Sequence, residues 1–389
     1  MSSLKSTLGD VADFINGAAF KPEDWGDEGS RIIRIQNLTD KDKPYNRTTR
    51  TVSERIHVHP GDLLVSWSAT LGVFEWDGPD VAYLNQHIFR VVPDLHKVDK
   101  RYLRHALELA LLDMRQHLHG ATMLHVNRGE FLSTKLYLPP LPEQRRIAAI
   151  LDTADALRAK RREALAQLDR LAQSIFVEMF GDPVANDRNW PTAKVSDFVA
   201  GFESGKSLVA DDEDEITAKF RVLKISAITS LEYRPEQSKA VPADYVPPAS
   251  HFVRNGDLLF SRANTTDLIG ATALVRDTPD NLLLPDKLWR FVWFNEPRAS
   301  VLYVRQLFQQ PKFRLEVGKR ASGSSGSMQN ISQPKVLSIP VGLPPLGMQR
   351  AFSKRVAEID ALKRHHQETL NALDNLFASL QHRAFRGEL

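Results

Sequence analysis

The chain has 389 residues, 42% of them hydrophobic and 25% charged, and its 51 Lys and Arg against 48 Asp and Glu leave a net charge of +3. This composition excludes intrinsic disorder and a polycationic nucleic-acid-coating protein, although a local basic face could still bind phosphates. The lack of cysteine excludes disulfides, thiolate metal sites and cysteine nucleophiles. We find no signal peptide or membrane span in the sequence, and therefore expect a cytoplasmic protein of two or three domains.

The first predicted elements in chain order form a mixed α and β region. Three β-rich runs are expected at residues 31–36, 62–67 and 87–92, and a helix at 100–118 has its apolar residues on one face. The same order returns later in the chain, with strands at 221–226, 257–261 and 288–293 and a helix near 298–310. The fold class that follows is α+β, built from two similar mixed modules.

Each mixed region is followed by a Leu-Pro-Pro-Leu segment, at 138–141 and 343–346, and then by a long predicted helix. Prolines make these segments stiff and extended, so the helices start after them. Apolar residues recur along both helices in alternating steps of four and three, which is the heptad pattern of a coiled coil. We expect the two helices to pair antiparallel through the following seam residues: Ile147, Leu151, Leu165, Leu168, Ile175, Phe352, Val356, Ile359, Leu370, Leu373, Phe377 and Leu380.

Two positions interrupt each seam with basic or potentially basic side chains. They are Arg158 and Arg161 in the first helix and Lys363 and His366 in the second. In an antiparallel pair these positions fall near the middle, where a polar layer can fix register at some cost in stability. We expect acidic neighbours to compensate their charge, namely Asp155, Glu163, Asp360 and Glu368.

The two halves of the chain are copies of one unit of about 200 residues. At an offset of 205, residues 138–180 and 343–385 are identical at 16 of 43 positions. Upstream, Gly61-Asp-Leu-Leu64 matches Gly256-Asp-Leu-Leu259, and Leu84 matches Leu284. Because these matches keep one order along the chain, we interpret the chain as an internal repeat with pseudo-twofold organisation.

The sequence contains no complete catalytic set. Gly201-Phe-Glu-Ser-Gly-Lys-Ser207 is one residue short of a phosphate-binding loop, so an NTPase is a remote alternative. A zinc site would need several of His57, His59, His117, His119 and His125 to converge, and surface or DNA-facing histidines are the better interpretation. Neither an acyl-transfer serine elbow nor an Asn-Pro-Pro-aromatic adenine methyltransferase motif is present. We therefore expect no catalytic residue and no metal site.

What remains is recognition chemistry on strand edges and loops. Several polar positions recur at matched places in the repeat, such as Trp67 with Arg262 and His87 with Lys287. The matched residues differ in identity, which two modules that recognise different sequences would require. The candidate DNA-binding residues are Arg47, Arg50, Ser66, Trp67, Ser68, Gln86, His87, Lys206, Ser261, Arg262, Asn264, Lys287, Ser324, Ser325, Gln329 and Asn330.

With these features, the chain resembles the specificity subunits of type I restriction-modification systems. The resemblance rests on Leu138-Pro-Pro-Leu-Pro-Glu-Gln-Arg145 opening a helix that ends Gln173-Ser-Ile-Phe-Val-Glu-Met-Phe-Gly-Asp-Pro183, and on the partial recurrence of this pattern from 343 to 389. Gly347-Met348 replaces Pro142-Glu143, which weakens capping of the second helix. The resemblance implies target recognition domains at 1–142 and 183–346, and coiled-coil helices at 143–182 and 347–389.

The family resemblance also implies partners and cofactors. Each recognition domain would bind one half of a bipartite target in double-stranded DNA, and the coiled coil would set their spacing. Two methyltransferase subunits would supply S-adenosylmethionine chemistry, and restriction subunits would use ATP with Mg²⁺, so no cofactor is expected in this chain. A coiled-coil scaffold for protein interactions, or a specificity subunit of a methylation-only or phage-defence assembly, stays an alternative.

Overall fold

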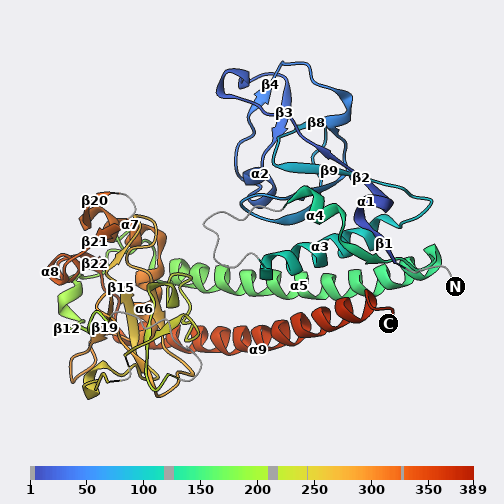
Figure 1. The fold of residues 1–389 in the computed structure, drawn as a ribbon. Helices are drawn as coiled ribbons and strands as arrows, with labels where there is room; N and C mark the ends of the chain where they lie inside the picture. The colour runs from blue at the N-terminus through green and yellow to red at the C-terminus, as the bar shows by residue number, and fades with distance from the viewer. Residues whose placement is uncertain (1–4, 118–126, 209–217, 243, 326–327) are drawn as a thin grey trace. The chain divides into compact units, whose positions relative to one another are not determined.

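The computed structural model describes residues 5–117, 127–208, 218–242, 244–325 and 328–389. The chain forms two compact units: unit 1 comprises Met1–Arg162 with Glu368–Leu389, and unit 2 comprises Glu163–Gln367. Each unit contains part of both long helices (Figure 1). The predicted division into two recognition domains and two separate helical regions cuts the chain at other positions and stays a prediction.

Unit 1 contains two four-stranded sheets, β2-β9-β6-β7 and β4-β3-β8-β5, and the pair β1-β10. Its core joins the first sheet to helix α3 and to parts of both long helices. The elements are β1 Lys5–Thr7, α1 Leu8–Val11, β2 Ala12–Asn16, η1 Pro22–Asp24, β3 Ser30–Ile33, α2 Ile35–Thr39, β4 Arg47–Thr48, η2 Glu54–Ile56, β5 His57–Val58, β6 Leu63–Ser66, β7 Gly72–Glu75, β8 Ala82–Leu84, β9 Ile88–Pro93, α3 Lys100–His117, α4 Arg128–Leu132, β10 Lys135–Tyr137 and the first part of α5 Leu141–Phe180.

Unit 2 repeats this topology with sheets β12-β19-β15-β17, β14-β13-β18 and β11-β22, and adds the three-stranded sheet β16-β21-β20. Its elements are the second part of α5, β11 Thr192–Lys194, η3 Val195–Asp197, β12 Gly201–Ser204, β13 Arg221–Leu223, η4 Ile225–Ala227, β14 Ser238–Ala240, η5 Ala249–His251, β15 Leu258–Ser261, β16 Ala263–Asn264, β17 Thr272–Leu274, β18 Leu282–Leu283, β19 Leu288–Val292, α6 Val301–Gln309, α7 Pro311–Arg320, β20 Ser322–Ser325, β21 Met328–Asn330, α8 Gln333–Leu337, β22 Pro340–Gly342 and the first part of α9 Leu346–Ala384. The structure thus confirms two similar α+β modules.

Three predicted elements differ in detail from those observed. The runs at 31–36 and 221–226 are strands only as far as Ile33 and Leu223, because helical turns begin at Ile35 and Ile225. The helix expected near 298–310 is α6, which is followed at once by α7. Pro311 explains the break, since the residue before a proline disfavours helical geometry and Gln310 accordingly has extended φ and ψ.

Helices α5 and α9 pack antiparallel within each unit. In unit 1, Arg158 Nε lies 2.6 Å from Asp374 Oδ1, while Arg146, earlier in α5, donates to the Leu389 carbonyl after α9. In unit 2, Lys363 Nζ lies 2.6 Å from Asp169 Oδ1, while the Phe352 ring packs 5.6 Å from Phe176. The predicted coiled-coil pairing is therefore confirmed.

The seam residues have the expected burial. Ile147, Leu151, Phe352, Val356, Ile359, Leu370 and Phe377 are buried, and Leu165, Leu168, Ile175, Leu373 and Leu380 are half-buried.

Compensation of the basic seam positions follows the prediction only in part. Asp155 does bind Arg158, at 2.8 Å, and Asp374 binds the same guanidinium. The prediction was wrong for Asp360, which is bound by Arg305 and Arg276 at 2.8 Å each, outside the seam. Lys363 instead uses Asp169 and Glu232. At Lys363, acidic residues of other elements thus take the place of the same-helix partner that sequence spacing favours.

A buried glutamine fixes the start of each long helix. In unit 1, Gln144 accepts from Asp99 N at 2.8 Å and donates to the carbonyls of Pro139 and Lys97. In unit 2, Gln349 accepts from Ser300 N at 2.9 Å and donates to the Pro344 carbonyl. The glutamine that follows each Leu-Pro-Pro-Leu segment therefore has a structural role. Its side-chain amide connects the extended proline segment to the helix and to the module.

We expect Gln144→Leu to lower the free energy of unfolding by about 1–3 kcal/mol, because it leaves the buried Pro139 carbonyl and two part-buried backbone groups without their partner. Urea unfolding of the purified chain measures the loss. Gln167→Leu is the matched control, since Gln167 is an exposed residue of the same helix, and it should change stability by less than about 0.5 kcal/mol. Equal stabilities of the two variants would contradict the role of Gln144.

Candidate nucleic-acid interface

The same backbone hydrogen bond occurs in both units, between the residue that follows one strand and the turn that precedes another. In unit 1, Trp67 N, after β6, donates to the His87 carbonyl at 3.4 Å. In unit 2, Arg262 N, after β15, donates to the Lys287 carbonyl at 3.1 Å. We call these places the rims: Trp67, Gln86 and His87 form rim 1, and Arg262, Asp286 and Lys287 form rim 2. The predicted matches Trp67 with Arg262 and His87 with Lys287 thus occupy equivalent positions.

The aspartate of the repeated Gly-Asp-Leu-Leu motif stabilises the strand that leads to each rim. Asp62 accepts from Arg90 Nε at 2.7 Å and from His59 N at 2.8 Å. In unit 2, Asp257 accepts from Arg290 at 3.2 Å and from Arg254 N at 2.9 Å. These ion pairs connect the start of β6 to β9 in unit 1, and the start of β15 to β19 in unit 2. The sequence analysis did not single out either arginine, although Arg90 and Arg290 are 200 residues apart, the same separation as that of the matched Leu84 and Leu284.

Rim 1 is aromatic. The Trp67 ring stacks on Phe89 with centroids 5.6 Å apart and meets the His87 ring edge-on at 5.4 Å. Gln86 is exposed, and its amide nitrogen lies 3.2 Å from His87 Nε2. Rim 1 therefore places a partly exposed indole beside an imidazole and an exposed amide.

Rim 2 is cationic. The Arg262 guanidinium lies 5.9 Å from the centre of the Trp289 ring, and its Nε donates to the Asp286 carbonyl at 2.9 Å. Lys287 is half-buried beside it, and Lys206 follows Gly205, whose N–H donates to Pro285. The structure thus brings Arg262 and Lys287 together, whereas the Lys206 ammonium lies over the Tyr245 ring at 5.9 Å.

The sheet β16-β21-β20 extends rim 2 with predicted amide side chains. Asn264 pairs with Gln329 in the strand register, and Ala263 pairs with Asn330. Ile331 N, the next residue, donates to the Arg262 carbonyl at 3.0 Å. Ser324 and Ser325 belong to β20, but their side chains lie outside the described part of the structure. Asn264, Gln329 and Asn330 are therefore near Arg262, as a shared site requires.

Three predicted serines are not available at the surface. Ser66 and Ser261 are fully buried and Ser68 is 6% exposed. The Ser66 hydroxyl donates to the Thr70 carbonyl at 2.6 Å, and the Ser261 hydroxyl donates to the Ala263 carbonyl at 3.3 Å. The Ser66 and Ser261 hydroxyls thus bind backbone carbonyls near strand ends and Ser68 is buried, so we remove all three from the candidate DNA contacts.

Arg47 and Arg50 lie on the other sheet of unit 1 or just after it. Arg47 donates to the Gly29 carbonyl at 2.7 Å, and Arg50 pairs with Asp24 at 3.0 Å. Both side chains already have acceptors within the unit, and their contribution to DNA binding stays a prediction.

The segment from Gly201 to Ser207 has a structural explanation. Residues 201–204 form strand β12, whose backbone pairs with β19, so these N–H groups do not surround a phosphate. A side chain on Gly205 would collide with the Leu284 carbonyl, and Gly17 meets Leu84 and Asn85 in the same way. The glycine is required for close backbone approach in both units, which removes the main support for an NTPase.

The histidines give no metal cluster in the described part of the chain. His57 stacks on Tyr83 at 4.9 Å, and His59 is exposed. His119 and His125, like the side chain of His117, lie outside the described residues. Among described residues, no three His, Asp or Glu side chains are arranged to hold a metal ion. Nor does any helix in these residues have both the length and the apolar character needed to cross a bilayer.

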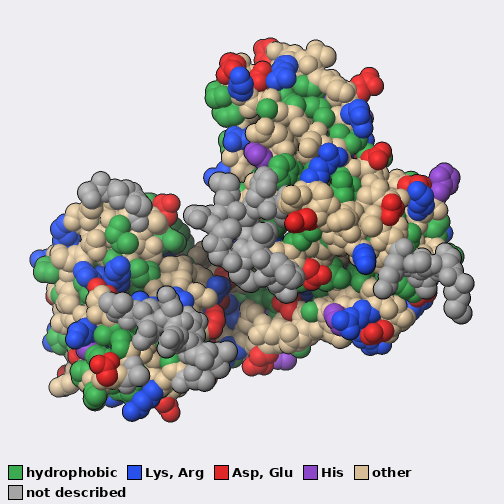
Figure 2. Space-filling model, viewed as in Figure 1, with side chains coloured by type: hydrophobic (Ala, Val, Ile, Leu, Met, Phe, Trp, Pro, Cys, Tyr) green, Lys and Arg blue, Asp and Glu red, His purple; other side chains and the backbone are tan. Residues whose placement is uncertain are grey.

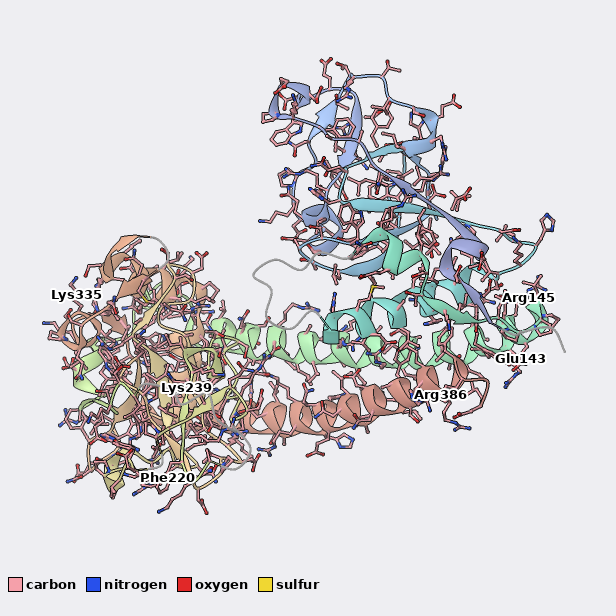
Figure 3. All side chains as sticks on the ribbon, in the orientation of Figure 1. Glu143, Arg145, Phe220, Lys239, Lys335 and Arg386 are labelled. Atoms are coloured by element: carbon pink, nitrogen blue, oxygen red, sulfur yellow. The ribbon has the colours of Figure 1, made fainter. Side chains whose placement is uncertain are left out.

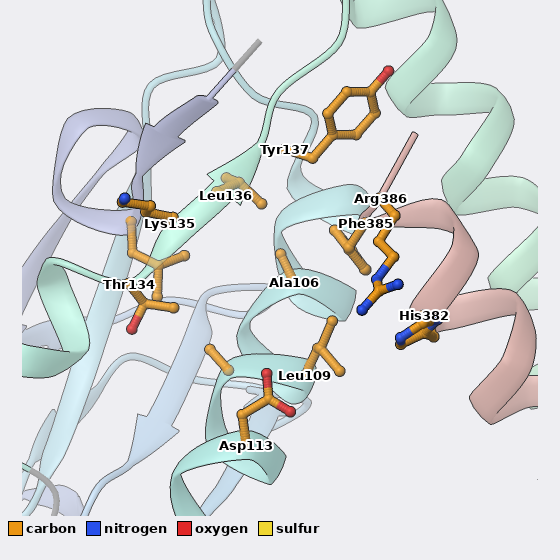
Figure 4. A pocket seen from close by; sticks show the side chains of 12 residues that line it. Ala106, Leu109, Asp113, Thr134, Lys135, Leu136, Tyr137, His382, Phe385 and Arg386 are labelled. Atoms are coloured by element: carbon orange, nitrogen blue, oxygen red, sulfur yellow. The ribbon is translucent and has the colours of Figure 1, made fainter. Parts of the chain in front are cut away.

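A pocket of about 360 Å³ lies in unit 1, between α3, β10 and the end of α9 (Figure 4). Asp113, Lys135, His382 and Arg386 line it together with apolar side chains. None of the rim residues borders this pocket. On the face drawn in Figure 2, basic and acidic side chains are interspersed over each unit.

Comparison with known proteins points in one direction. The family model described as "Type I restriction modification DNA specificity domain" matches residues 3–168. The type I restriction enzyme EcoBI specificity subunit of Escherichia coli is 24% identical over 437 residues, covering 100% of this chain and 86% of that protein. The Escherichia coli EcoEI specificity subunit is 29% identical over 175 residues, which span 43% of this chain and only 29% of that subunit.

A solved structure has a similar fold. The S subunit of a type I restriction-modification system from M. genitalium matches with a TM-score of 0.51 at 14% identity, covering 98% of this chain and 95% of that chain.

Proposed function

Because the chain belongs to the family of type I restriction-modification DNA specificity subunits, we propose that each of its two modules recognises one half of a bipartite DNA sequence. One observation carries this proposal: the two rims have the same backbone arrangement but different side chains. Equivalent positions hold Trp67 and His87 in unit 1 and Arg262 and Lys287 in unit 2. Two modules of one design with different contacts suit two different half-sites.

In this proposal the chain selects the site and makes or breaks no covalent bond. Two methyltransferase subunits supply S-adenosylmethionine chemistry on adenine, and restriction subunits use ATP with Mg²⁺. The small net charge of +3 suits such an assembly, because partner subunits can neutralise much of the DNA phosphate charge. The paired helices set the distance between the modules and hence the spacer between half-sites.

Exposed leucines on the long helices suit the docking of these partners. In unit 1, Leu157 and Leu376 are 47% and 50% exposed, beside the contact of Arg158 with Asp374. In unit 2, Leu171 and Leu362 are each 46% exposed, beside the contact of Lys363 with Asp169. The pairs are related by the 205-residue offset, which suits one copy of the same partner on each unit.

We expect Leu157→Asp combined with Leu376→Asp to reduce the bound methyltransferase subunits from two to one, because charge in an apolar contact is costly to desolvate. Mass measurement of the purified complex gives the stoichiometry. Leu171→Asp with Leu362→Asp should have the same effect through the other unit. Leu95→Asp is the control, since Leu95 is 65% exposed in unit 1 outside the helices. Two bound subunits in both double variants would contradict this docking site.

DNA binding tests the proposed function itself. The chain with its methyltransferase subunit should bind a duplex carrying the bipartite target more tightly than a scrambled duplex, and both affinities should fall steeply with salt. A coiled-coil scaffold for other proteins would show neither sequence preference nor salt-dependent duplex binding. Equal, weak binding of both duplexes would therefore favour the scaffold.

A further inference from the structure

We propose that Arg262 contacts a guanine in the half-site of the second module, and that the first module lacks this contact because Trp67 occupies the equivalent position. The inference rests on the proposed function and adds to it the chemical identity of one base pair.

The backbone of Arg262 is held from two sides. Its N–H donates to the Lys287 carbonyl at 3.1 Å, and its carbonyl accepts from Ile331 N at 3.0 Å. These bonds join the end of β15 to the turn before β19 and to the end of β21. The Arg262 backbone is therefore held in place between two neighbouring segments. A side chain that recognises a base needs such a rigid backbone.

The side chain is oriented as well as anchored. Its Nε donates to the Asp286 carbonyl at 2.9 Å, and the guanidinium lies over the Trp289 ring at 5.9 Å. The Asp286 carboxylate is 4.0 Å from Nη2, beyond hydrogen-bond distance. Among the described residues, neither Nη1 nor Nη2 has a hydrogen-bond partner, and the side chain is 32% exposed. The edge that carries both terminal nitrogens thus remains available to a ligand.

Two parallel N–H donors on one planar edge match guanine best. In the major groove, guanine presents two adjacent acceptors, O6 and N7, whereas adenine presents one acceptor beside a donor. A second Arg262 N–H would therefore face a donor on adenine. A phosphate could also accept both bonds, but that contact would not depend on sequence.

The first module cannot make the same contact at this position. Trp67 makes the equivalent backbone hydrogen bond. However, its ring stacks on Phe89, whereas in unit 2 the Arg262 guanidinium lies over the Trp289 ring. An indole has a single N–H donor and cannot bind two acceptors side by side. The two half-sites should therefore differ at the base pairs facing these positions.

The test is adenine-methylation sequencing in a host that carries the cognate methyltransferase subunit with the wild-type chain, R262K or R262Q. Arg262→Lys keeps the charge but loses the two-donor edge. Both variants should accept other bases at one position of one half-site, a position that is G·C in the wild-type target. Discrimination there should fall by on the order of 10- to 100-fold, with the other half-site unchanged.

Lys335→Ala is the matched control, since Lys335 is an exposed cation on α8 of the same unit (Figure 3), and it should leave the motif intact. Relaxation at an A·T pair, or weaker methylation of all sites without relaxation at any position, would overturn the inference while leaving the proposed function in place. A wild-type chain that yields no bipartite motif would overturn the proposed function and the inference with it.

Discussion

Removing one heptad from each long helix, residues 159–165 and 364–370, should abolish modification at the original target spacing and favour a spacer about three base pairs shorter. Seven helical residues correspond to about 10 Å, which is about three steps of duplex DNA. The two deletions are related by the 205-residue offset, and both lie between the contacts of Arg158 with Asp374 and of Lys363 with Asp169. Both seams therefore keep their heptad register.

Methylation of a duplex library with spacers of graded length measures this change. Deleting residues 159–165 alone is the control, because the helices then lose their mutual register and the chain should lose stability rather than change its preferred spacer. An unchanged spacer preference in the double deletion would show that the helices do not set the distance between half-sites.

Asp360→Ala should lower the free energy of unfolding by about 3–5 kcal/mol, because it leaves the largely buried Arg305 guanidinium without a counter-charge. Both terminal nitrogens of Arg305 bind the Asp360 carboxylate, at 2.8 and 3.1 Å, and Arg276 adds a third bond at 2.8 Å. The side chains of Asp360 and Arg305 are only 11% and 12% exposed. Urea unfolding followed by tryptophan fluorescence measures the loss.

The internal repeat provides the control for this prediction. Asp155 is the equivalent of Asp360 at the 205-residue offset, but its side chain is 35% exposed and it binds Arg158 at 2.8 Å. Such an ion pair contributes about 0–1 kcal/mol, so Asp155→Ala should cost far less than Asp360→Ala. Equal losses in both variants would show that burial does not distinguish the two pairs.

The repeat is what made the fold predictable. Matched landmarks in the sequence pair Trp67 with Arg262 and His87 with Lys287, and the structure confirms the equivalence of their backbone positions. Heptad spacing alone predicted which faces of α5 and α9 are buried, since a helix exposes its side chains with a regular period.

Burial of single polar groups was not predictable in the same way. Ser66 and Ser261 recur at matched places, which suggested a shared contact, but both hydroxyls bind nearby backbone carbonyls inside the fold. A serine hydroxyl can bind DNA or a nearby backbone carbonyl. Which of the two it does depends on the path of the chain after the strand. Asp360 illustrates the same limit, because Arg276 and Arg305 reach it from elements distant in the sequence.

Sequencing of methylated adenines in a host with and without this chain, in the presence of its methyltransferase subunit, tests the central claim that two modules recognise two half-sites. The account predicts a chain-dependent motif of two unlike half-sites separated by a spacer of fixed length and free sequence. A single continuous motif, or the same motif in the absence of the chain, would contradict it.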